Sequence, residues 1–103
     1  MTRGVVYALW CELCDKVYVG QTGQRLGDRF VQHLRSVRRN DGQPVSRHFN
    51  APCHRGDVSH LQVFGLAAAT PASNRLNVES RLINKLGTLF PGGLNTRSDI
   101  SRR

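Results

Sequence analysis

Residues 5–20 read VVYALWCELCDKVYVG, and two segments within them, Val5–Cys11 and Lys16–Gly20, are rich in β-branched and aromatic residues. Two such segments joined by a short connection are typical of a β-hairpin. Their composition favours strands that are buried on at least one face. The stretch therefore predicts that the fold is built on an antiparallel sheet.

The connection between the two strands sets the register of the hairpin. If Glu-Leu at positions 12 and 13 forms a two-residue turn, Cys11 faces Cys14 and Tyr7 lies opposite Tyr18. A cross-strand aromatic pair of this kind stabilises a sheet. Glu-Leu is a poor two-residue turn unless something else holds it, so the register is left open.

Helical and strand patterns alternate along the rest of the chain. Gln21-Thr22-Gly23 is expected to end the second strand, with Thr22 capping a helix over residues 24–39. Pro44 opens a short helix, His60–Ala68 is expected to form a third strand, and a helix over 73–86 ends before Gly87. This order predicts an α/β (α+β) domain with a small three-stranded antiparallel sheet flanked by helices.

Each long helix has an apolar stripe that contains a polar, titratable residue. The apolar residues are Leu26, Phe30, Leu34 and Val37 in the first helix, and Leu76, Leu82, Ile83 and Leu86 in the second. Glu79 lies within the second stripe. An ionised carboxylate that faces a core costs roughly several kcal/mol unless it is paired or binds a metal. His33 lies within the first stripe, one turn after Arg29.

These inward-facing groups have a plain explanation and a functional one. A lone core histidine is most often hydrogen-bonded to a backbone carbonyl. Glu79, however, is one of only two glutamates in the chain, and two helices both direct a polar group inward. A shared site therefore explains the pattern better than two coincidences. A single inward carboxylate in a basic domain suggests one-metal phosphodiester chemistry.

The composition restricts the partners of the chain. A length of 103 residues corresponds to one domain, expected over 1–97 and followed by a mobile basic tail over 98–103. The net charge of +8 comes from 13 arginines and 2 lysines, and arginine matches phosphate oxygens better than lysine does. A solubilising surface or an anionic membrane is a weaker explanation than a nucleic-acid partner. The candidate DNA-binding residues are Arg25, Arg35, Arg38 and Arg39, and Arg97, Arg102 and Arg103 load the tail.

Hydrophobicity along the chain bears on where the protein is found. No apolar run approaches the ~18 residues of a membrane span, and the N-terminus lacks the apolar region of a signal peptide. We therefore expect no membrane partner and a reducing, intracellular location. We also expect the isolated domain to be a monomer.

Cysteine and histidine residues occur at metal-ligand spacing. Cys11-x2-Cys14 joins two strands, which favours a zinc knuckle over a redox motif at the start of a helix. His48 and His54 can complete a tetrahedral structural zinc site. The alternative is that both histidines lie on the surface and the cysteines pair or stay free. Cys53, beside His54, is a rival ligand.

The ordered set of these residues resembles the GIY-YIG nuclease family over about residues 4–95. The matching positions are Tyr7, Tyr18-Val19-Gly20, Arg29, His33, Glu79 and Asn95. Val5-Val6-Tyr7 departs from the family's first tripeptide but keeps its tyrosine. The resemblance implies a catalytic set of Tyr7, Tyr18, Arg29, His33, Glu79 and Asn95. It also implies a GIY-YIG-like fold and Mg²⁺- or Mn²⁺-dependent DNA endonuclease activity.

In more detail, the chain resembles the endonuclease domain of Penelope-like retroelements, in which two cysteines and two histidines form a zinc site. Cys11, Cys14, His48 and His54 match that group. This resemblance implies DNA nicking, fusion to a reverse transcriptase and a nuclear location.

The family mechanism gives each site residue a role. Glu79 would bind Mg²⁺ or Mn²⁺, and Tyr7 would activate water. Arg29 would stabilise charge on the phosphate, while His33 and Tyr18 would orient groups or relay protons. Asn95 would support the metal site.

Two other functions compete with the nuclease. A zinc-stabilised nucleic-acid-binding module without catalysis explains the charge and the Cys/His set, but not Glu79 and His33 on buried stripes. An adaptor for an acidic protein explains only the charge.

Overall fold

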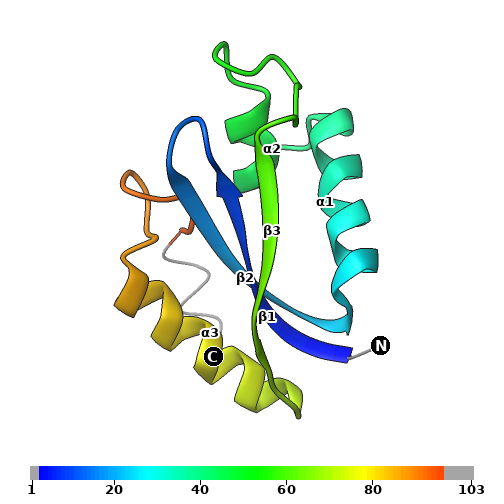
Figure 1. The fold of residues 1–103 in the computed structure, drawn as a ribbon, viewed down its shortest axis with the longest axis vertical. Helices are drawn as coiled ribbons and strands as arrows, with labels where there is room; N and C mark the ends of the chain where they lie inside the picture. Colours follow the sequence, from blue (N-terminus) through cyan, green and yellow to red (C-terminus); the bar gives the residue numbers. More distant parts are fainter. Residues whose placement is uncertain (1–2, 97–103) are drawn as a thin grey trace.

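The computed structural model describes residues 3–96 (Figure 1). Its elements in chain order are β1 (Arg3–Cys11), β2 (Lys16–Arg25), α1 (Leu26–Arg39), α2 (Pro44–Phe49), β3 (Leu61–Ala68) and α3 (Ala72–Leu86). This order confirms the predicted α/β (α+β) class. The predicted tail over 98–103, together with Arg97, Arg102 and Arg103, lies outside the described residues, so its division from a domain over 1–97 stays a prediction.

The sheet has three antiparallel strands in the order β2-β1-β3. The central strand is β1, and β2 and β3 are its two edges. The third strand expected from the sequence is therefore part of the sheet and begins one residue later than predicted. Because β2 is an edge strand, its outer side is open to groups from outside the sheet.

The register of the hairpin differs from the one that a two-residue turn would give. Tyr7 pairs with Gly20, and Tyr18 pairs with Leu9, so the tyrosine pair that a two-residue turn would give does not form. The shift amounts to two residues, and side chains alternate between faces with a period of two. Tyr7 and Tyr18 therefore still lie on the same face of the sheet.

The longer turn explains this shift. Cys11 pairs with Lys16 rather than with Cys14, and residues 12–15 connect the strands. Asp15 has a φ of 53°, and its N–H donates to the Cys11 carbonyl at 2.7 Å. Aspartate tolerates this left-handed conformation better than most residues. A four-residue turn thus replaces the unfavourable Glu-Leu turn.

The start of the first long helix was also misplaced. Thr22 does not cap it: the strand continues to Arg25, and α1 begins at Leu26. Thr22 pairs with Val5 of β1, and its hydroxyl accepts a hydrogen bond from the Gln24 N–H at 3.0 Å. Pairing with β1 thus keeps an apparently strand-breaking sequence extended.

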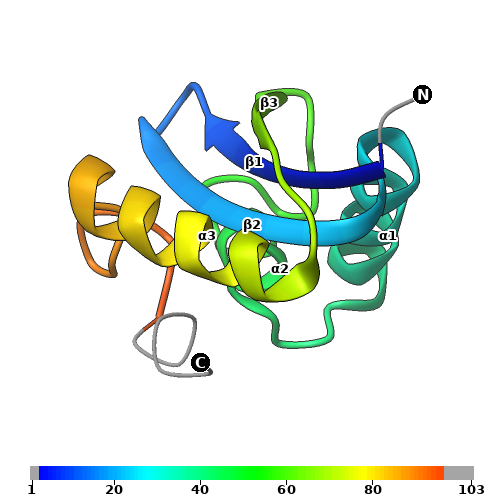
Figure 2. The same cartoon turned by 90° about the horizontal axis from the view of Figure 1, so that it is seen from below.

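Two cores lie on opposite faces of the sheet. On one face α1 and α2 cover a core that contains Val5, Tyr7, Leu9, Tyr18, Val37 and Phe49. On the other face α3 covers a smaller core that contains Val6, Val19 and Ile83. Figures 1 and 2 show α1 and α3 on opposite sides of the sheet. Both helices also contact β2, so two layers meet at this edge strand.

The stripe of α3 matches the prediction only in its centre, since Leu76 is partly buried but belongs to neither core. Val78, Leu82 and Ile83 pack in the smaller core, whereas Leu86 is 53% exposed. Leu86 lies two turns after Glu79 on the same side of the helix, so α3 extends past the part of the core that buries Glu79. Within residues 3–96, no helix combines the length and hydrophobicity needed to cross a bilayer.

Candidate active site and metal centre

Tyr7, Tyr18 and His33 meet between the hairpin and α1. Tyr7 Oη lies 2.6 Å from His33 Nε2, and both tyrosine rings stand edge-on to the imidazole with centroids 5.7 Å away. All three residues are buried. His33 Nε2 therefore contacts a phenol hydroxyl, and not a backbone carbonyl as the plain explanation of a core histidine would have it.

Gly20 makes room for this contact. A Cβ at position 20 would lie 2.6 Å from Tyr7 Oη and 2.9 Å from a ring carbon of Tyr18. Both distances are shorter than van der Waals contact allows, and buried side chains have little space to move. Close packing, and not an unusual backbone conformation, therefore requires glycine here.

We expect Gly20→Ala to lower the free energy of unfolding by about 1–3 kcal/mol, because the new methyl group displaces two buried rings. The matched control is Gly27→Ala in α1, where an added Cβ meets nothing within 4 Å. This control should leave the free energy of unfolding unchanged or raise it by up to about 1 kcal/mol. Urea unfolding of both variants provides the measurement, and equal stability of the two would contradict the packing argument.

The environment of His33 keeps its imidazole neutral. The pKa of His33 is lowered from 6.5 to about 4, mainly by burial and in smaller part by the positive charge of Arg29, while Asp41 partly opposes the change. A neutral imidazole can accept a proton at Nε2 when its other nitrogen carries the hydrogen. At pH 7 the Tyr7 hydroxyl can then donate to His33 Nε2.

The lowered pKa of His33 makes stability depend on pH. The unfolded chain binds the proton near pH 6.5 and the folded chain only near pH 4, so His33 favours unfolding as the pH falls through this window. The loss should approach about 3 kcal/mol at the acid end. The variant His33→Gln should therefore lose less stability than the parent between pH 6.5 and pH 4. Urea unfolding of the zinc-loaded proteins across this range tests it, and parallel curves would contradict it.

Arg29 lies beside His33, as predicted from their spacing. It lines a pocket of about 380 Å³ together with Tyr18, His33 and Arg39. Its Nη1 donates to Gln32 Oε1 at 3.0 Å, which holds the guanidinium on the same side of α1. Asp41 also lines the pocket and pairs with Arg39, so Arg29 is the guanidinium there that an anion can meet beside the phenol and the imidazole.

Glu79 faces inward, as its place in the apolar stripe predicted. Its side chain is fully buried and takes part in polar interactions within the fold. It belongs to α3, which lies on the opposite side of the sheet from His33. Arg75, one turn earlier on α3, reaches β2 and donates from Nε to Gln21 Oε1 at 3.0 Å. Glu79 and His33 thus belong to two helices that flank the same edge strand.

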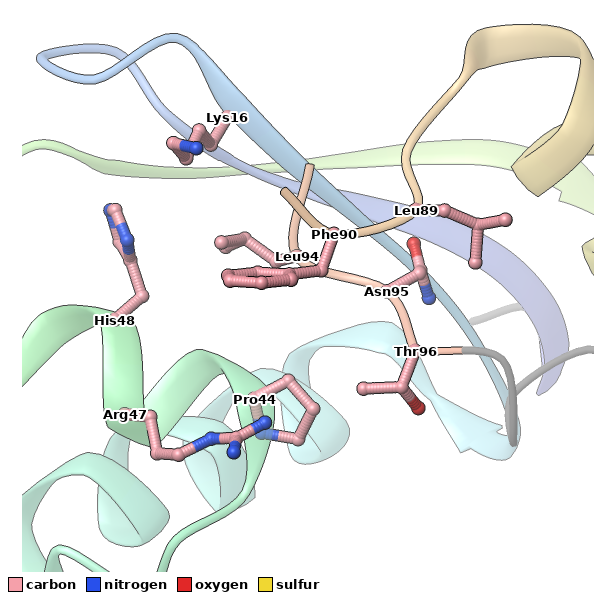
Figure 3. Close-up of a pocket in the computed structure, with 9 residues that line it drawn as sticks. All are labelled: Lys16, Pro44, Arg47, His48, Leu89, Phe90, Leu94, Asn95 and Thr96. Atoms are coloured by element: carbon pink, nitrogen blue, oxygen red, sulfur yellow. The ribbon is translucent and has the colours of Figure 1, made fainter. Parts of the chain in front are cut away.

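Asn95 closes part of the outer edge of β2. Figure 3 shows it on the loop after α3. Its Oδ1 accepts the Val19 N–H at 2.8 Å, and its Nδ2 donates to the Val19 carbonyl at 2.8 Å. The Thr88 hydroxyl donates to the same Oδ1 at 2.7 Å. Asn95 therefore holds the loop after α3 against the strand that carries Tyr18.

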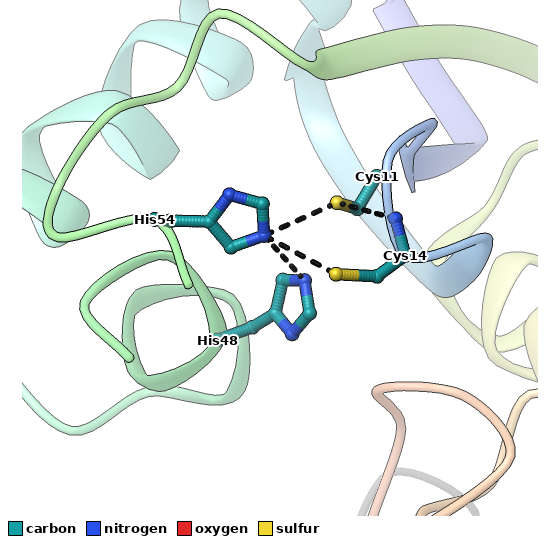
Figure 4. Close-up of side chains that lie close together, drawn as sticks. All are labelled: Cys11, Cys14, His48 and His54. Atoms are coloured by element: carbon teal, nitrogen blue, oxygen red, sulfur yellow. Dashed lines mark hydrogen bonds between the residues drawn. The ribbon is translucent and has the colours of Figure 1, made fainter. Parts of the chain in front are cut away.

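Cys11, Cys14, His48 and His54 converge at the tip of the hairpin (Figure 4). Their ligand atoms all lie within 4.8 Å of one another. His54 Nε2 lies 3.4 Å from each cysteine Sγ and 3.2 Å from His48 Nε2. One imidazole nitrogen has a single lone pair or a single hydrogen, so it cannot bond three partners at once. A central cation explains this arrangement.

The spacing of these atoms fits zinc. With Zn–S near 2.3 Å and Zn–N near 2.0–2.1 Å, tetrahedral ligand atoms are separated by about 3.3–3.8 Å. The two distances from His54 Nε2 to the cysteine Sγ atoms fall in this range, and its 3.2 Å distance to His48 Nε2 lies just below it. The Cys14 N–H also donates to Cys11 Sγ at 3.4 Å, the kind of outer contact that steadies a thiolate ligand. The predicted cluster can therefore hold a metal ion.

Cys53 lies beside this cluster but outside it. The pKa of Cys14 is raised to about 11, mainly by burial, next by the nearby Cys11 sulfur and least by Cys53. Cys53 is exposed, whereas His54 is buried and touches both thiols of the Cys11–Cys14 pair. The geometry thus favours His54 over Cys53 as the fourth ligand.

Comparisons with known proteins bear on the fold. No protein-family model matches the chain, and no curated protein shows significant sequence similarity to it. Two solved structures superpose on it with TM-scores of 0.74 and 0.75. One is the catalytic domain of homing endonuclease I-TevI, 18% identical, covering 90% of this chain and 97% of that chain. The other is a mutant of the catalytic domain of intron endonuclease I-TevI, 20% identical, covering 91% and 93%. The chain has the GIY-YIG nuclease fold.

Within this GIY-YIG fold, one predicted DNA-binding arginine ends β2 and the other three belong to α1. Arg25, Arg35, Arg38 and Arg39 are all exposed. Arg39 lines the pocket that also contains Arg29. It lies 3.6 Å from a carboxylate oxygen of Asp41. Their contact with DNA stays a prediction.

Two segments of the GIY-YIG fold contribute residues near the candidate site that no sequence pattern indicated. Arg75 reaches β2 from α3, and Arg47 on α2 lines a second pocket with Phe90 from the loop after α3. The only sequence signal for Phe90 was an aromatic residue directly before a Pro-Gly-Gly turn. Loop residues have no periodicity to reveal which way they point.

Proposed function

We propose that this chain is a metal-dependent DNA endonuclease that hydrolyses phosphodiester bonds. One observation carries the proposal: Tyr7 Oη lies 2.6 Å from His33 Nε2 inside a GIY-YIG fold. A phenol beside a neutral imidazole can pass a proton and thereby help to activate water. The similar structures are endonuclease catalytic domains by name, which supports the same class of activity here.

The reacting phosphate is expected at the outer edge of β2. Tyr7, Tyr18 and His33 approach this strand from one face of the sheet, and Glu79 belongs to the helix on the other face. Arg29 borders the pocket beside Tyr18 and His33. At the edge of a sheet, side chains from both faces can contact the same ligand, because no further strand separates them.

Each side chain has a role that its surroundings support. Tyr7 orients the attacking water and passes a proton to His33, which is neutral because burial lowers its pKa to about 4. Arg29 binds the phosphate oxygens, where its charge is most useful as negative charge accumulates. Tyr18 packs against His33 and helps to orient it. Asn95 holds the β2 edge in place through Val19.

Glu79 is the residue that we assign to the catalytic cation. A carboxylate is a hard oxygen ligand, which suits Mg²⁺ or Mn²⁺, and a fully buried one gains by meeting a positive charge. A divalent cation held there would polarise the scissile phosphate and stabilise the departing 3′ oxygen. Glu79 would position the cation, because α3 packs on the sheet and contacts β2.

Zinc is assigned a structural role at the Cys/His cluster. Its four candidate ligands leave no open position for a substrate, which is typical of structural sites. The cluster joins the tip of the hairpin to α2 and to the segment after it. A zinc ion there would fix the turn over residues 12–15.

The wider biological setting is a further part of the proposal. The Cys/His spacing on a GIY-YIG fold supports the endonuclease domain of a Penelope-like retroelement. Such a domain would nick DNA in the nucleus as part of a protein that also carries a reverse transcriptase, and would be monomeric when isolated.

Supercoiled plasmid provides the test of the proposed function. Zinc-loaded protein is dialysed against metal-free buffer and then incubated with plasmid in Mg²⁺, in Mn²⁺ or without a divalent ion. We expect open-circular product first, and only with a divalent ion. Salt-sensitive DNA binding without cleavage in any divalent ion would instead favour a zinc-stabilised nucleic-acid-binding module.

A further inference from the structure

A second pocket, of about 640 Å³, lies between α2, the start of β2 and the loop after α3 (Figure 3). Arg47 from α2, Lys16 from β2, and Phe90, Leu94 and Asn95 from the loop line it. Pockets that bind small organic groups commonly have volumes of roughly 300–1,000 Å³. The pocket is large enough for one nucleotide.

Phe90 gives this pocket an aromatic surface. Its side chain is 74% exposed, the most exposed large hydrophobic residue of the described part of the chain. The loop that carries it is nevertheless well ordered by hydrogen bonds. The Phe90 N–H donates to the Asn95 carbonyl at 2.7 Å, and the Leu94 N–H donates to the Val17 carbonyl at 2.9 Å. A ring displayed on a fixed loop loses little conformational freedom when it binds a planar ligand.

The charged residues of the pocket select the ligand class. Lys16 and Arg47 are both cationic, and no described residue that lines the pocket is acidic. Within residues 3–96, no carboxylate forms an ion pair with Arg47. An aromatic face beside two cations is the combination that single-stranded nucleic acids meet on their binding proteins.

We propose that this pocket binds one unpaired nucleotide of a nucleic-acid strand, with its base against Phe90 and its phosphate at Arg47 and Lys16. The inference rests on the proposed function and adds a strand-binding subsite to it. A base within a duplex is stacked on both sides, so it reaches a concave pocket only when it is unpaired or flipped out.

Continuity with the candidate active site supports this assignment. Asn95 lines the pocket and also hydrogen-bonds Val19, the neighbour of Tyr18. Pro44 lines this pocket and Val45 lines the one that contains Arg29. Adjacent residues of α2 thus separate the two pockets, and one strand can occupy both.

Binding of two labelled DNA strands tests the proposal. One is a short deoxythymidine strand, and the other has the same phosphates but abasic sites in its centre. By fluorescence anisotropy without Mg²⁺ or Mn²⁺, the parent should bind the intact strand about tenfold more tightly. Phe90→Ala should remove this difference by weakening only the intact strand. Phe64→Ala, at an exposed aromatic residue of β3, should preserve it.

Arg47→Gln supplies the second arm, because it removes a charge and keeps the ring. It should weaken both strands by a similar factor and reduce the slope of log Kd against log salt by roughly one. Equal affinity of the parent for the two strands, or a preference that survives Phe90→Ala, would overturn the subsite. Plasmid nicking by the parent then reports separately on the proposed function. If the parent nicks plasmid but does not prefer the intact strand, only the subsite is refuted. If it prefers the intact strand but does not nick plasmid, only the nuclease function is refuted.

Discussion

Replacing Glu79 with glutamine is expected to lower the rate of plasmid nicking at least about 100-fold while leaving zinc content and DNA affinity within about twofold of the parent. Glutamine keeps the shape of the fully buried side chain but removes the charge that we assign to the catalytic cation. Neutralising a buried carboxylate also removes a desolvation cost, so the fold should survive the change. Initial nicking rates at saturating Mg²⁺, with thermal unfolding in parallel, provide the measurement.

The chain offers a matched control for this substitution. Glu12, the other glutamate, is exposed, and its carboxylate accepts a hydrogen bond from Gln62 and lies 3.8 Å from His60 Nδ1. Glu12→Gln makes the same chemical change there and should nick at the parental rate. Tyr7→Phe, which removes the hydroxyl beside His33, should lose activity as Glu79→Gln does. If Glu79→Gln nicks as fast as Glu12→Gln, Glu79 is a structural carboxylate and the assigned cation site is wrong.

Removing one thiol of the Cys/His cluster is the second change with a large expected effect. Cys14→Ser should reduce bound zinc from about one equivalent to near zero and lower the free energy of unfolding by at least about 3 kcal/mol. The ligands come from the hairpin, α2 and the segment after α2, so losing the ion releases three parts of the fold together. Metal analysis of protein purified without added zinc, followed by urea unfolding, measures both effects.

Cys53→Ser is the control that separates the cluster from its neighbour. Cys53 is exposed and lies next to Cys14, but His54 Nε2 already contacts both thiols of the cluster. The variant should therefore keep its zinc and its stability. Loss of zinc in Cys53→Ser together with its retention in His54→Gln would mean that the fourth ligand is misassigned.

Residues with a strong periodic pattern could be placed from the sequence, and residues whose position depends on distant contacts could not. The hairpin and the two long helices follow from alternating and helical apolar spacing. The hairpin register could not be decided from the sequence because the turn depends on Asp15 in a left-handed conformation. The predicted start of α1 was too early because pairing between Thr22 and Val5 keeps the strand extended.

The same distinction applies to the candidate site. His33 and Glu79 could be predicted to face inward, because each interrupts an apolar stripe. The contact between Tyr7 and His33 could not be predicted, since it needs the correct register and the space that Gly20 leaves. The four zinc-ligand candidates were found because ligand chemistry restricts both residue type and spacing. Phe90 and Arg47 have no such restriction, and only the folded loop brings them together.

The two hydrogen bonds between the Asn95 amide and the Val19 backbone affect how readily this sheet edge can self-associate. Sheet edges commonly recruit strands from other molecules, and β2 is an edge strand that the proposed function requires to stay accessible to DNA. The Asn95 amide offers Val19 the same donor and acceptor that a neighbouring strand would offer, but only for one residue. A strand from another molecule therefore cannot pair with the N–H and carbonyl of Val19. A ligand that contacts side chains does not need these backbone groups. The Asn95 amide, together with the Leu94 N–H that binds the Val17 carbonyl, can thus discourage aggregation at this edge.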